Sequence, residues 1–599
     1  MVESSTPAAR TSGHEVLTGA TYWFTGLSGA GKSTLSEYCK AFLDKDLGSS
    51  KAVFILDGDV IRTGLNKDLG FSPEARKENI RRITEVSKLF NMAGMIVFVA
   101  FISPYAADRD AAKDAHTAAG LKFYECYISA SLEVCEGRDV KGLYKKARDG
   151  TIPNFTGVTA PYDAPTNCDL NINTGELPIE GCKNMVVRQM EEAGVLRNLA
   201  SPRVVDSLVV EPTEAQHAAM KDFPTLHINK EQAEYLQTIA EGFAFPLTRF
   251  MNEMELLESM QMQTVTDKNG QAHLLSVPIT QFCNEEEKTA IGDAPAVNLV
   301  CDELGADVLA VIHKPVFFAN RKEEISARTF GTFSQKHPKI ECIMAQGDWL
   351  ISGDSMHFCK HVMFNDGIDK YRLTPRQIQA AIKEKNADAV YGFQVRNPLH
   401  NGHCLLLNDT REQLLKQGYK NPILLLHPLG GWCKDDDVPL DTRMAQHQAL
   451  LDDGTLNPEH TILAVWPSPM YYGGPTEVLW HASSRVNCGM THFVTGRDPA
   501  GVKHPETGGD CYDVWHGQKI LVHLKHMLNG VEVVPFKVAA YNKVEGKMTF
   551  FTPGVSKGAD FDFISGSRMR EMAKTGTTPP DGFMSPGGWE CLAAYYKAL

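Results

Sequence analysis

One nine-residue segment near the N-terminus constrains the fold of this chain more than any other feature. Residues 26–34 read GLSGAGKST and fit the pattern G-x-x-x-x-G-K-[ST], between the apolar run Tyr22–Thr25 and an amphipathic helical pattern. In that context the glycines turn backbone N–H groups toward phosphate oxygens, Lys32 reaches the outer phosphates, and Ser33 can hold Mg²⁺. A tight turn would explain the glycines alone, but not the lysine and hydroxyl in register. We expect the phosphates of a nucleotide to be bound by the residues Gly29, Ala30, Gly31, Lys32, Ser33 and Thr34.

Alternating apolar patterns around that segment predict an α/β fold. Strand-like runs occur at Tyr22–Thr25, Ala52–Leu56, Met95–Ile102, Phe123–Ile128 and Leu170–Thr174. Helical patterns lie between them, which is typical of a parallel sheet covered by helices. The first helix has a predicted buried stripe of Leu35, Tyr38, Cys39, Phe42 and Leu43. Ser72 and Pro73 predict the N-cap and first turn of a second helix.

A second α/β pattern occupies the C-terminal part of the chain. Strand-like runs return at Ala389–Phe393, Ile423–Leu426, Thr461–Trp466, Phe493–Thr495 and Val531–Val534. Before them lie mixed short strands and helices without a strong catalytic pattern, and the periodicity lapses around Ser201-Pro202 and Glu211-Pro212. We therefore predict one domain at 1–198, a linker at 199–213, a second domain at 214–360 and a third at 361–599.

The composition is that of a globular protein in water. Of 599 residues, 43% are hydrophobic and 22% are charged, and the formal net charge of -13 argues against a general nucleic-acid or anionic-membrane binder. No apolar run approaches the roughly 20 residues that a membrane helix needs. The 14 cysteines form no C-x-x-C pair, and the N-terminus lacks the apolar core of a signal peptide. We expect reduced, mostly buried thiols and a cytoplasmic protein.

Carboxylates follow the second predicted strand at Asp57-Gly58-Asp59. The carboxyl edge of an open α/β sheet is where ligands bind, so one carboxylate could assist Mg²⁺ and the other accept a proton from a hydroxyl. Alone, this tripeptide is more often a turn. The residues Arg62, Arg76 and Asn79 follow and can grip a second anionic ligand beside the glycine-rich segment.

Five motifs in order make residues 15 to 195 resemble adenylylsulfate kinase: GLSGAGKST, LDGDVIRTGLNKDLGFS, ENIRR, FISPYAADRD and RDVKGLYKKARDGTIPNFTG. The resemblance implies that the nucleotide in the glycine-rich segment is ATP and that Arg138 also binds it. It further implies that Asp59 is the base on the ribose 3′-hydroxyl and that residues 141–155 form a mobile lid. The residues it places around adenylylsulfate are Asp59, Arg62, Phe71, Arg76, Asn79, Ile102, Ser103, Lys141, Asn154 and Phe155. One departure is Val60, because the family usually has asparagine after this aspartate.

Two histidines, His400 and His403, stand at the start of a helical run predicted to continue from Leu405 to Gln417. At i and i+3 they can converge on one phosphate, to which the helix dipole adds positive potential. Two other interpretations compete: capping or core histidines, and a metal-binding pair. Metal ligation is less favoured because no H-E-x-x-H pattern or cysteine pair accompanies them.

The sequence around these histidines, QVRNPLHNGH, resembles ATP sulfurylase and carries the H-x-G-H signature of nucleotidylyltransferases. LHPLGGW, GRDPAG, VPFKVAAYN and ISGSRMR follow in family order, and the resemblance covers about residues 215 to 599. It implies that Arg396 and Arg497 bind sulfate while His400 and His403 stabilise the triphosphate, and it leaves Asp498 as a Mg²⁺ ligand or, preferably, a structural carboxylate. The residues it places around ATP and sulfate are Gln394, Arg396, Asn397, His400, His403, Gly496, Arg497, Asp498, Pro499, Ala500 and Ala539.

Both resemblances, in the domain order of animal-type PAPS synthases, imply a P-loop parallel-sheet kinase domain, a mixed α+β PUA-like domain and a Rossmann-like nucleotidylyltransferase domain. They imply two reactions: ATP and sulfate give adenylylsulfate and pyrophosphate, then ATP and adenylylsulfate give 3′-phosphoadenylylsulfate (PAPS) and ADP. Mg²⁺ with ATP and a homodimer are also implied, without a nucleic-acid or membrane partner. Two alternatives stay open: one half is a nucleotide-sensing regulatory domain, or the chain is a nucleotide-dependent scaffold or RNA-binding protein.

Overall fold

The computed structural model describes residues 14–47, 52–139, 141–198, 205–434, 437–528, 530–534, 537–552, 556, 558–563 and 566–598. They form two compact units, one with the residues up to 198 and the segment 413–420, the other with the remaining residues. Residues 199–204 of the predicted linker lie outside the described ranges. From Val205 on, the linker is bonded to the second unit, because Leu208 N donates to Ala240 O at 2.7 Å and Val210 N to Phe358 O at 2.9 Å.

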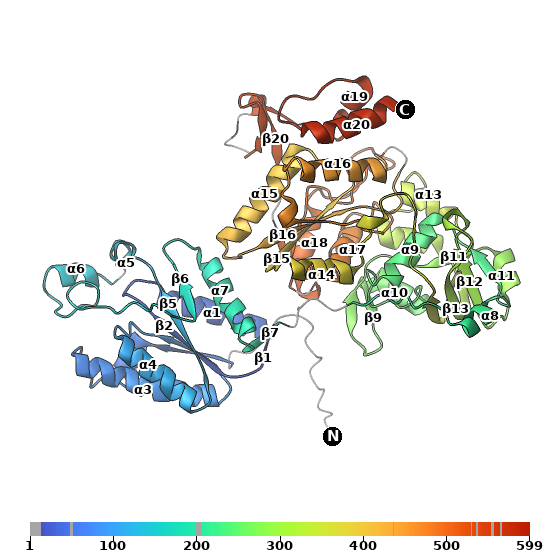
Figure 1. The fold of residues 1–599 in the computed structure, drawn as a ribbon. Helices are drawn as coiled ribbons and strands as arrows, with labels where there is room; N and C mark the ends of the chain where they lie inside the picture. The colour runs from blue at the N-terminus through green and yellow to red at the C-terminus, as the bar shows by residue number, and fades with distance from the viewer. Residues whose placement is uncertain are drawn as a thin grey trace. The chain divides into compact units, whose positions relative to one another are not determined.

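The first unit is built on a five-stranded parallel sheet (Figure 1). Its strands, in spatial order, are β3 (Val53–Asp57), β4 (Ile96–Ala100), β2 (Ala20–Thr25), β5 (Lys122–Ile128) and β6 (Leu170–Ile172). β1 (His14–Val16) pairs separately with β7 (Leu196–Asn198). The helices are α1 (Lys32–Leu47), α2 (Gly58–Thr63), α3 (Pro73–Met92), α4 (Ala106–Ala118), α5 (Leu132–Arg138), α6 (Leu143–Arg148) and α7 (Ile179–Glu192). The five predicted strands and their parallel arrangement are confirmed.

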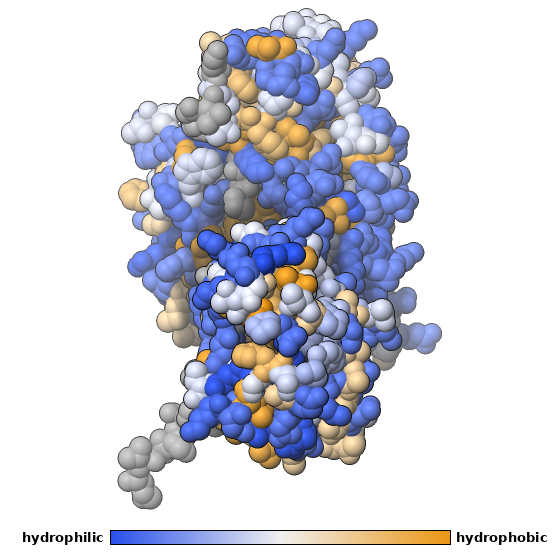
Figure 2. Space-filling view, turned by 90° about the vertical axis from the view of Figure 1, so that its left-hand side faces the viewer, coloured by the Kyte–Doolittle hydropathy of each residue, from blue (hydrophilic) through white to orange (hydrophobic). Residues whose placement is uncertain are grey.

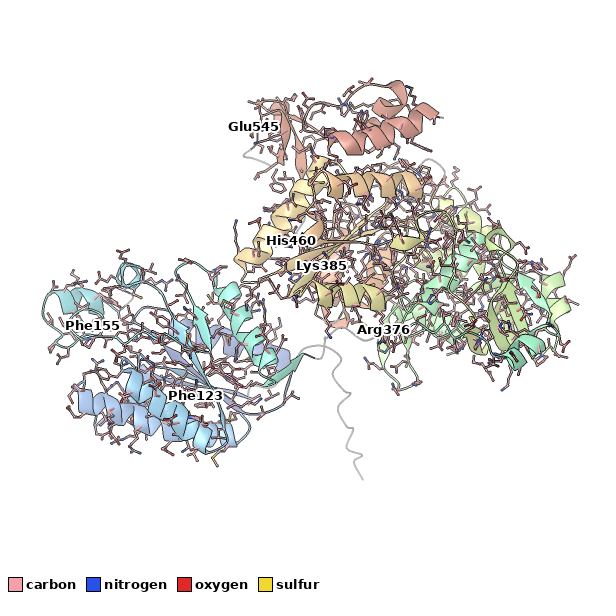
Figure 3. The ribbon with its side chains drawn as sticks, in the orientation of Figure 1. Phe123, Phe155, Arg376, Lys385, His460 and Glu545 are labelled. Atoms are coloured by element: carbon pink, nitrogen blue, oxygen red, sulfur yellow. The ribbon has the colours of Figure 1, made fainter. Side chains whose placement is uncertain are left out.

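Both faces of this sheet are covered by helices, and the alternation of side chains along β2 explains how. Tyr22 and Phe24 pack with α1 and α7 in one core, whereas Trp23 packs with α3 and α4 in the other. Phe123, labelled in Figure 3, belongs to the second core. The predicted N-cap is confirmed, since the Ser72 hydroxyl accepts from Ala75 N at 3.3 Å. The prediction for Tyr38 was wrong, because its ring is 38% exposed and its hydroxyl donates to Glu180.

The second unit begins with a mixed sheet, as the irregular sequence pattern predicted. Its strands in spatial order are β11 (Gln281–Cys283), β14 (Trp349–Phe358), β13 (Val308–Ala319), β12 (Ala296–Val300) and β8 (Thr225–His227), of which only β8 and β12 pair in parallel. β9 (Thr264–Thr266) and β10 (Ala272–Leu274) form a hairpin. The helices are α8 (Glu214–Met220), α9 (Lys230–Ala240), α10 (Glu253–Met262), α11 (Glu285–Ile291), α12 (Lys322–Phe330) and α13 (Pro338–Met344).

A second parallel sheet follows, again with all five predicted strands. Their spatial order is β17 (Thr461–Leu463), β16 (Pro422–Pro428), β15 (Ala389–Val395), β18 (His492–Val494) and β19 (Glu532–Val534). The helices are α14 (Pro375–Glu384), α15 (Asn401–Lys416), α16 (Leu440–Asp452), α17 (Pro475–Val486) and α18 (His516–Leu524). One hydrophobic core continues from the mixed sheet into this sheet, which explains why both belong to one unit.

The C-terminal residues form a small subdomain that the sequence patterns did not predict. β20 (Ala539–Asn542) pairs with β21 (Lys547–Phe550) and β22 (Phe561–Asp562), followed by α19 (Gly566–Thr575) and α20 (Pro586–Ala598). Tyr541, Met569, Phe583 and Leu592 pack in its core together with Val438 from the preceding sheet domain. These strands are too short to show a clear period in the sequence.

The surface and the thiols agree with the composition. Within the described ranges, none of the helices combines the length and the apolar character that a membrane crossing requires. The face in Figure 2 is mainly hydrophilic, with apolar side chains in scattered patches. All 14 cysteines are free, and most are buried, as predicted.

Candidate active sites

The glycine-rich segment forms the turn between β2 and α1. Gly26, Gly29 and Gly31 have positive φ angles of 152°, 76° and 99°, which side chains rarely allow. The Lys32 ammonium donates to the carbonyls of Gly26 and Leu27 at 2.9 and 2.7 Å, and burial lowers its pKa to about 8. The turn therefore combines open amides, a helix N-terminus and an inward cation, which suits a phosphate chain. Thr34, by contrast, is exposed on α1.

Two further residues brace this turn. Arg138, at the end of α5, donates to Gly29 O at 3.2 Å and to the Thr174 hydroxyl at 3.1 Å. The Thr174 hydroxyl in turn donates to Ala30 O at 2.6 Å. The structure thus brings the predicted Arg138 to the turn. Thr174 was not predicted as a site residue, although it ends one of the predicted strand-like runs.

A hydroxyl and a carboxylate meet at the adjoining strand end. The Ser33 hydroxyl donates to Asp57 Oδ2 at 2.6 Å, and Asp57 also accepts from Asp59 N at 2.8 Å as the N-cap of α2. Such hard oxygen ligands beside a phosphate-binding turn fit Mg²⁺. Ser33 was the predicted ligand, and Asp57 is its direct partner.

Asp59 and Lys141 form an ion pair on the open side of the same edge. The side chain of Lys141 is 59% exposed and that of Asp59 is 71% exposed. An ion pair so exposed contributes little to stability. Both groups are therefore available to a bound ligand, one as an acceptor of protons and the other as a cation.

The predicted arginines surround Phe71, whose ring is 64% exposed. The Arg62 guanidinium lies 4.5 Å from the centre of that ring. Arg76 donates to Phe71 O at 3.0 Å, to Asn154 O at 2.8 Å and to the Thr156 hydroxyl at 2.7 Å. An aromatic ring and two guanidinium groups thus gather near α2, with an arrangement suited to a base and an anion.

The lid segment reaches the glycine-rich turn in this structure. Tyr144 of α6 donates from its hydroxyl to Ser28 O at 2.8 Å, and its ring meets Phe155 edge-on with centroids 5.0 Å apart. Figure 3 places Phe155 beside α6. Asn154 has a positive φ of 56° and connects to α3 through Arg76. The predicted lid residues are therefore bonded to the glycine-rich turn and, through Arg76, to α3.

Of three other predicted residues, Asn79 and Ser103 are buried and Ile102 is partly buried. Asn79 is 5% exposed, and its Oδ1 accepts from Asn66 Nδ2 at 2.7 Å. Ser103 has a positive φ of 41° and accepts from the Trp23 indole at 3.1 Å. Ile102 O accepts from the Thr25 hydroxyl at 2.8 Å. These contacts fix the floor of the site, and they engage the side chains of Asn79 and Ser103 with protein groups.

In the second unit, β15 ends in a run of polar side chains at the carboxyl edge of the sheet. Gln394 Nε2, Arg396 NH1 and Asn397 Oδ1 are buried and have no hydrogen-bond partner among the described residues. Asp498, which follows the neighbouring strand β18, likewise has a buried Oδ1 without a hydrogen-bond partner among the described residues. Buried polar atoms without partners are rare in proteins, so this group indicates a place for a polar ligand.

His400 and His403 stack on one another at the start of α15, with ring centroids 3.9 Å apart. Each Nδ1 accepts from a backbone N–H, of Gly402 at 3.1 Å and of His400 at 3.3 Å respectively. Burial lowers the pKa of His403 to about 4 and that of His400 well below its usual value. Both rings are thus neutral at pH 7 with the proton on Nε2, ready to donate to phosphate oxygens.

This pair of histidines is held from both sides. Gln446 Oε1 accepts from Leu399 N at 3.0 Å, and Gln446 Nε2 donates to Leu399 O at 2.7 Å. Phe583 stacks on His400 with centroids 5.2 Å apart, and its carbonyl accepts from Asn401 N at 2.9 Å. Neither Gln446 nor Phe583 was predicted. Among the described residues, no group of three His, Cys, Asp or Glu side chains is arranged to hold a metal.

The turn after β18 contains the second predicted arginine. Asp498 and Ala500 have positive φ angles of 49° and 56°, and Asp498 N donates to Val514 O at 2.7 Å. Pro499 O lies 2.9 Å from His516 Nε2.

The other predicted residues of this region differ in exposure. Arg497 is exposed and Gly496 is partly buried. Burial raises the pKa of Asp498. Ala539 stands at the start of β20, partly buried.

The chain was compared with known proteins. Family models match in three stretches: adenylylsulphate kinase over residues 18–173, a PUA-like domain over 200–358 and ATP-sulfurylase over 369–595. ATP sulfurylase 2 of Arabidopsis thaliana is 44% identical over 423 residues, which cover 70% of this chain and 87% of that protein. Adenylyl-sulfate kinase of Acaryochloris marina is 53% identical over 175 residues, which cover 29% of this chain and 83% of that protein.

One relative spans nearly the whole length. It is the probable bifunctional SAT/APS kinase 2 of Sorangium cellulosum, 32% identical over 600 residues, which cover 95% of this chain and 98% of that protein. The two stretches with enzyme matches coincide with the two parallel sheets and their polar carboxyl edges.

Proposed function

The chain belongs to the family of enzymes that join an adenylylsulfate kinase to an ATP sulfurylase, and from this premise we propose which residues act in each half. The C-terminal half converts ATP and sulfate to adenylylsulfate and pyrophosphate, and the N-terminal half phosphorylates adenylylsulfate with ATP to give PAPS and ADP. The observation that carries the residue assignment is that each parallel sheet ends in its own set of phosphate- and anion-binding groups. No group is shared between the two sets.

In the sulfurylase half, Arg396 and Arg497 hold the sulfate dianion, with the Ala500 amide as a further donor. Gln394, Asn397 and the turn from Gly496 surround ATP. His400 and His403 donate from Nε2 to the triphosphate and stabilise the charge that develops as sulfate attacks the α-phosphorus. This is catalysis by positioning and preorganised donors, without a covalent enzyme intermediate.

In the kinase half, Lys32 neutralises the outer phosphates of ATP in the glycine-rich turn. Asp59 breaks its ion pair with Lys141 and accepts the proton of the ribose 3′-hydroxyl. Arg62 and Arg76 hold the anionic groups of adenylylsulfate. Ser33 and Asp57 are the residues that would hold Mg²⁺. When bound, Mg²⁺ supplies positive charge to the phosphate oxygens of the transferred group.

One experiment tests both halves together. Purified protein is mixed with MgATP, labelled sulfate and pyrophosphatase, and the labelled products are separated. We expect adenylylsulfate first and PAPS as the end product. Label that stops at adenylylsulfate would favour the alternative in which the kinase half is a regulatory domain. Absence of labelled product, together with PAPS formation from supplied adenylylsulfate, would make the sulfurylase half the regulatory one.

We also propose the domain limits 1–198, 199–213, 214–360 and 361–599. Support comes from the separate compact units, although residues 413–420 group with the first one. A fragment of residues 1–205 is expected to fold and to phosphorylate supplied adenylylsulfate. An unfolded fragment by circular dichroism would contradict an independent kinase domain.

For assembly and location we propose a homodimer in the cytoplasm. The family resemblance supports the homodimer, and the free thiols support a reducing compartment. Sedimentation equilibrium is expected to give twice the chain mass, and cell fractionation is expected to place the protein with cytosolic markers. A monomer at micromolar concentration, or recovery with organelles, would contradict these two proposals.

A further inference from the structure

A short turn contacts both of the segments to which sulfate binding is assigned. It comprises residues 471–474, between β17 and α17. The Tyr472 ring centre lies 5.0 Å from the Arg396 guanidinium, and Gly474 N donates to Ala500 O at 3.0 Å. One turn thus touches the arginine after β15 and the loop after β18.

A buried carboxylate holds this turn. Glu477 is fully buried, and its two oxygens accept from Tyr471 N at 3.0 Å and from Gly473 N at 3.1 Å. The residue between these amides, Tyr472, has a positive φ of 57°, which is unusual for a bulky side chain. Such a conformation persists only where surrounding contacts impose it. The clamp by Glu477 supplies these contacts.

The Tyr472 side chain is also fixed at its far end. Its hydroxyl donates to Asp437 Oδ2 at 3.1 Å and accepts from Lys434 N at 3.0 Å. Its carbonyl accepts from the Tyr512 hydroxyl at 3.1 Å. The side chain is fully buried. The ring that faces Arg396 is therefore held rigidly in place.

A neutral ring is a suitable support for an arginine that must bind an anion. Within the described part of the chain, no carboxylate lies within ion-pair distance of Arg396, and NH1 of its guanidinium is buried without a partner. A carboxylate support would neutralise the guanidinium and occupy its donors. An aromatic face attracts the cation and leaves both its charge and its N–H groups available.

We propose that Tyr472, clamped by Glu477, is a positioning residue that orients Arg396 and the Ala500 backbone for sulfate. The proposal rests on the proposed function, which assigns sulfate to Arg396. It gives a role in the sulfurylase reaction to a tyrosine and a glutamate that do not themselves touch the reacting atoms.

The test compares Tyr472→Phe with Tyr472→Met in the full-length protein, by sulfate-dependent pyrophosphate release. Phenylalanine keeps the aromatic face, so the KM for sulfate is expected to stay within about threefold of the wild type. Methionine fills similar space without that face, and the KM for sulfate is expected to rise about tenfold, while the KM for MgATP changes less than about twofold. Equal increases in both KM values, or a loss of kcat alone, would overturn the proposal.

Glu477→Gln provides an independent variant if Tyr472→Met does not fold, as judged by circular dichroism. The amide keeps the shape but replaces one acceptor by a donor, so the KM for sulfate is again expected to rise selectively. An unchanged KM for sulfate in folded Glu477→Gln would overturn the clamp. Arg396→Ala distinguishes a failure of the proposed function from a failure of this inference. Wild-type sulfate kinetics in Arg396→Ala would contradict the assignment of sulfate to Arg396. An inactive Arg396→Ala together with wild-type kinetics in Tyr472→Met would contradict only the positioning role of Tyr472.

Discussion

The two sites differ in how far the protein completes them before a ligand arrives. In the kinase unit, Asp59, Phe71 and Lys141 have side chains that are more than half exposed. In the sulfurylase unit, the supporting residues Tyr472, Glu477 and Phe583 are fully or almost fully buried, and of the two predicted sulfate-binding arginines only Arg497 is exposed. A site of exposed groups is completed by its ligand, whereas a site of buried groups is preorganised. The difference indicates that one fold class, the parallel sheet with a polar carboxyl edge, supports both strategies.

The electrostatics of the two sites differ in the same direction. The kinase edge presents exposed charges in a pair, Lys141 and Asp59, and a buried ammonium at Lys32. At the sulfurylase edge, His400 and His403 are kept neutral by burial. The cationic side chains at this edge are therefore arginines.

The largest expected effect is that of Lys32→Ala, which breaks the kinase site alone. Loss of the cation on the outer phosphates should reduce phosphorylation of supplied adenylylsulfate by about 1,000-fold or more. Sulfate-dependent pyrophosphate release should be unchanged, because Lys32 belongs to the other compact unit. Labelled sulfate should then stop at adenylylsulfate, in small amount unless pyrophosphatase is present.

The matched variant for that experiment is Arg497→Ala. It should abolish sulfate-dependent pyrophosphate release and leave the kinase reaction intact. Loss of both activities in either folded variant would contradict two separate sites. Normal PAPS formation by Lys32→Ala would show that the interpretation of the glycine-rich turn is wrong.

The second prediction concerns two aromatic residues, Phe583 and Phe71. Phe583 is 1% exposed and stacks on His400, so Phe583→Ala should destabilise the second unit by about 3–5 kcal/mol. Phe71 is 64% exposed, so Phe71→Ala should change stability by less than about 0.5 kcal/mol and instead raise the KM for adenylylsulfate. Urea unfolding and kinetics of both variants check this contrast. Equal destabilisation by the two would contradict the comparison of the sites.

The fold was largely predictable because its main signals are local. Ten apolar runs of strand length were correctly assigned to the two parallel sheets, since strands buried on both faces need continuous apolar segments. The C-terminal subdomain was missed because β20, β21 and β22 are short. The exposure of Tyr38 was missed because helical periodicity does not tell where the edge of the covering sheet lies.

The candidate sites could be located from the sequence only where their residues stand in short motifs. Lys32, Ser33, His400 and His403 stand in segments whose spacing itself carries the chemistry. Supporting residues come from far along the chain. Gln446 reaches Leu399 across 47 positions, and Glu477, in the first turn of α17, belongs to none of the sequence motifs. Such contacts follow from tertiary packing and leave no periodic signal in the sequence.

The third prediction uses the pKa of Lys32, which burial lowers to about 8. Bound phosphates favour the charged amine and raise that pKa. Below pH 8 the amine is already charged and the KM for ATP in the kinase reaction should be constant. Above pH 8, ATP binding requires the Lys32 amine to take up a proton. The KM for ATP should therefore rise by up to about tenfold per pH unit. Lys32→Arg, which keeps its charge, should remove this slope.

The sulfurylase reaction provides the contrast in the same pH series. Burial lowers the pKa of His403 to about 4. The rate of the sulfurylase reaction should therefore show no inflection near pH 6.5, where an ordinary histidine titrates. An inflection there that disappears in His403→Asn would contradict the neutral, preorganised histidine pair. A flat KM for ATP in the kinase reaction up to pH 9.5 would contradict the buried ammonium.

The smallest expected effect is that of Val60→Asn, at the position where the chain departs from the kinase pattern. Val60 follows Asp59 on α2 and is 67% exposed, so the substitution should change stability by less than about 0.5 kcal/mol. A new hydrogen bond to adenylylsulfate would contribute about 0.5–1.5 kcal/mol, which corresponds to a KM roughly two- to tenfold lower. Val60→Ala is the control, because it removes the same apolar surface without adding an amide. If alanine lowers the KM as much as asparagine, the amide makes no contact with the ligand. If only asparagine does, the exposed edge of the kinase site has gained a ligand contact without repacking of the core.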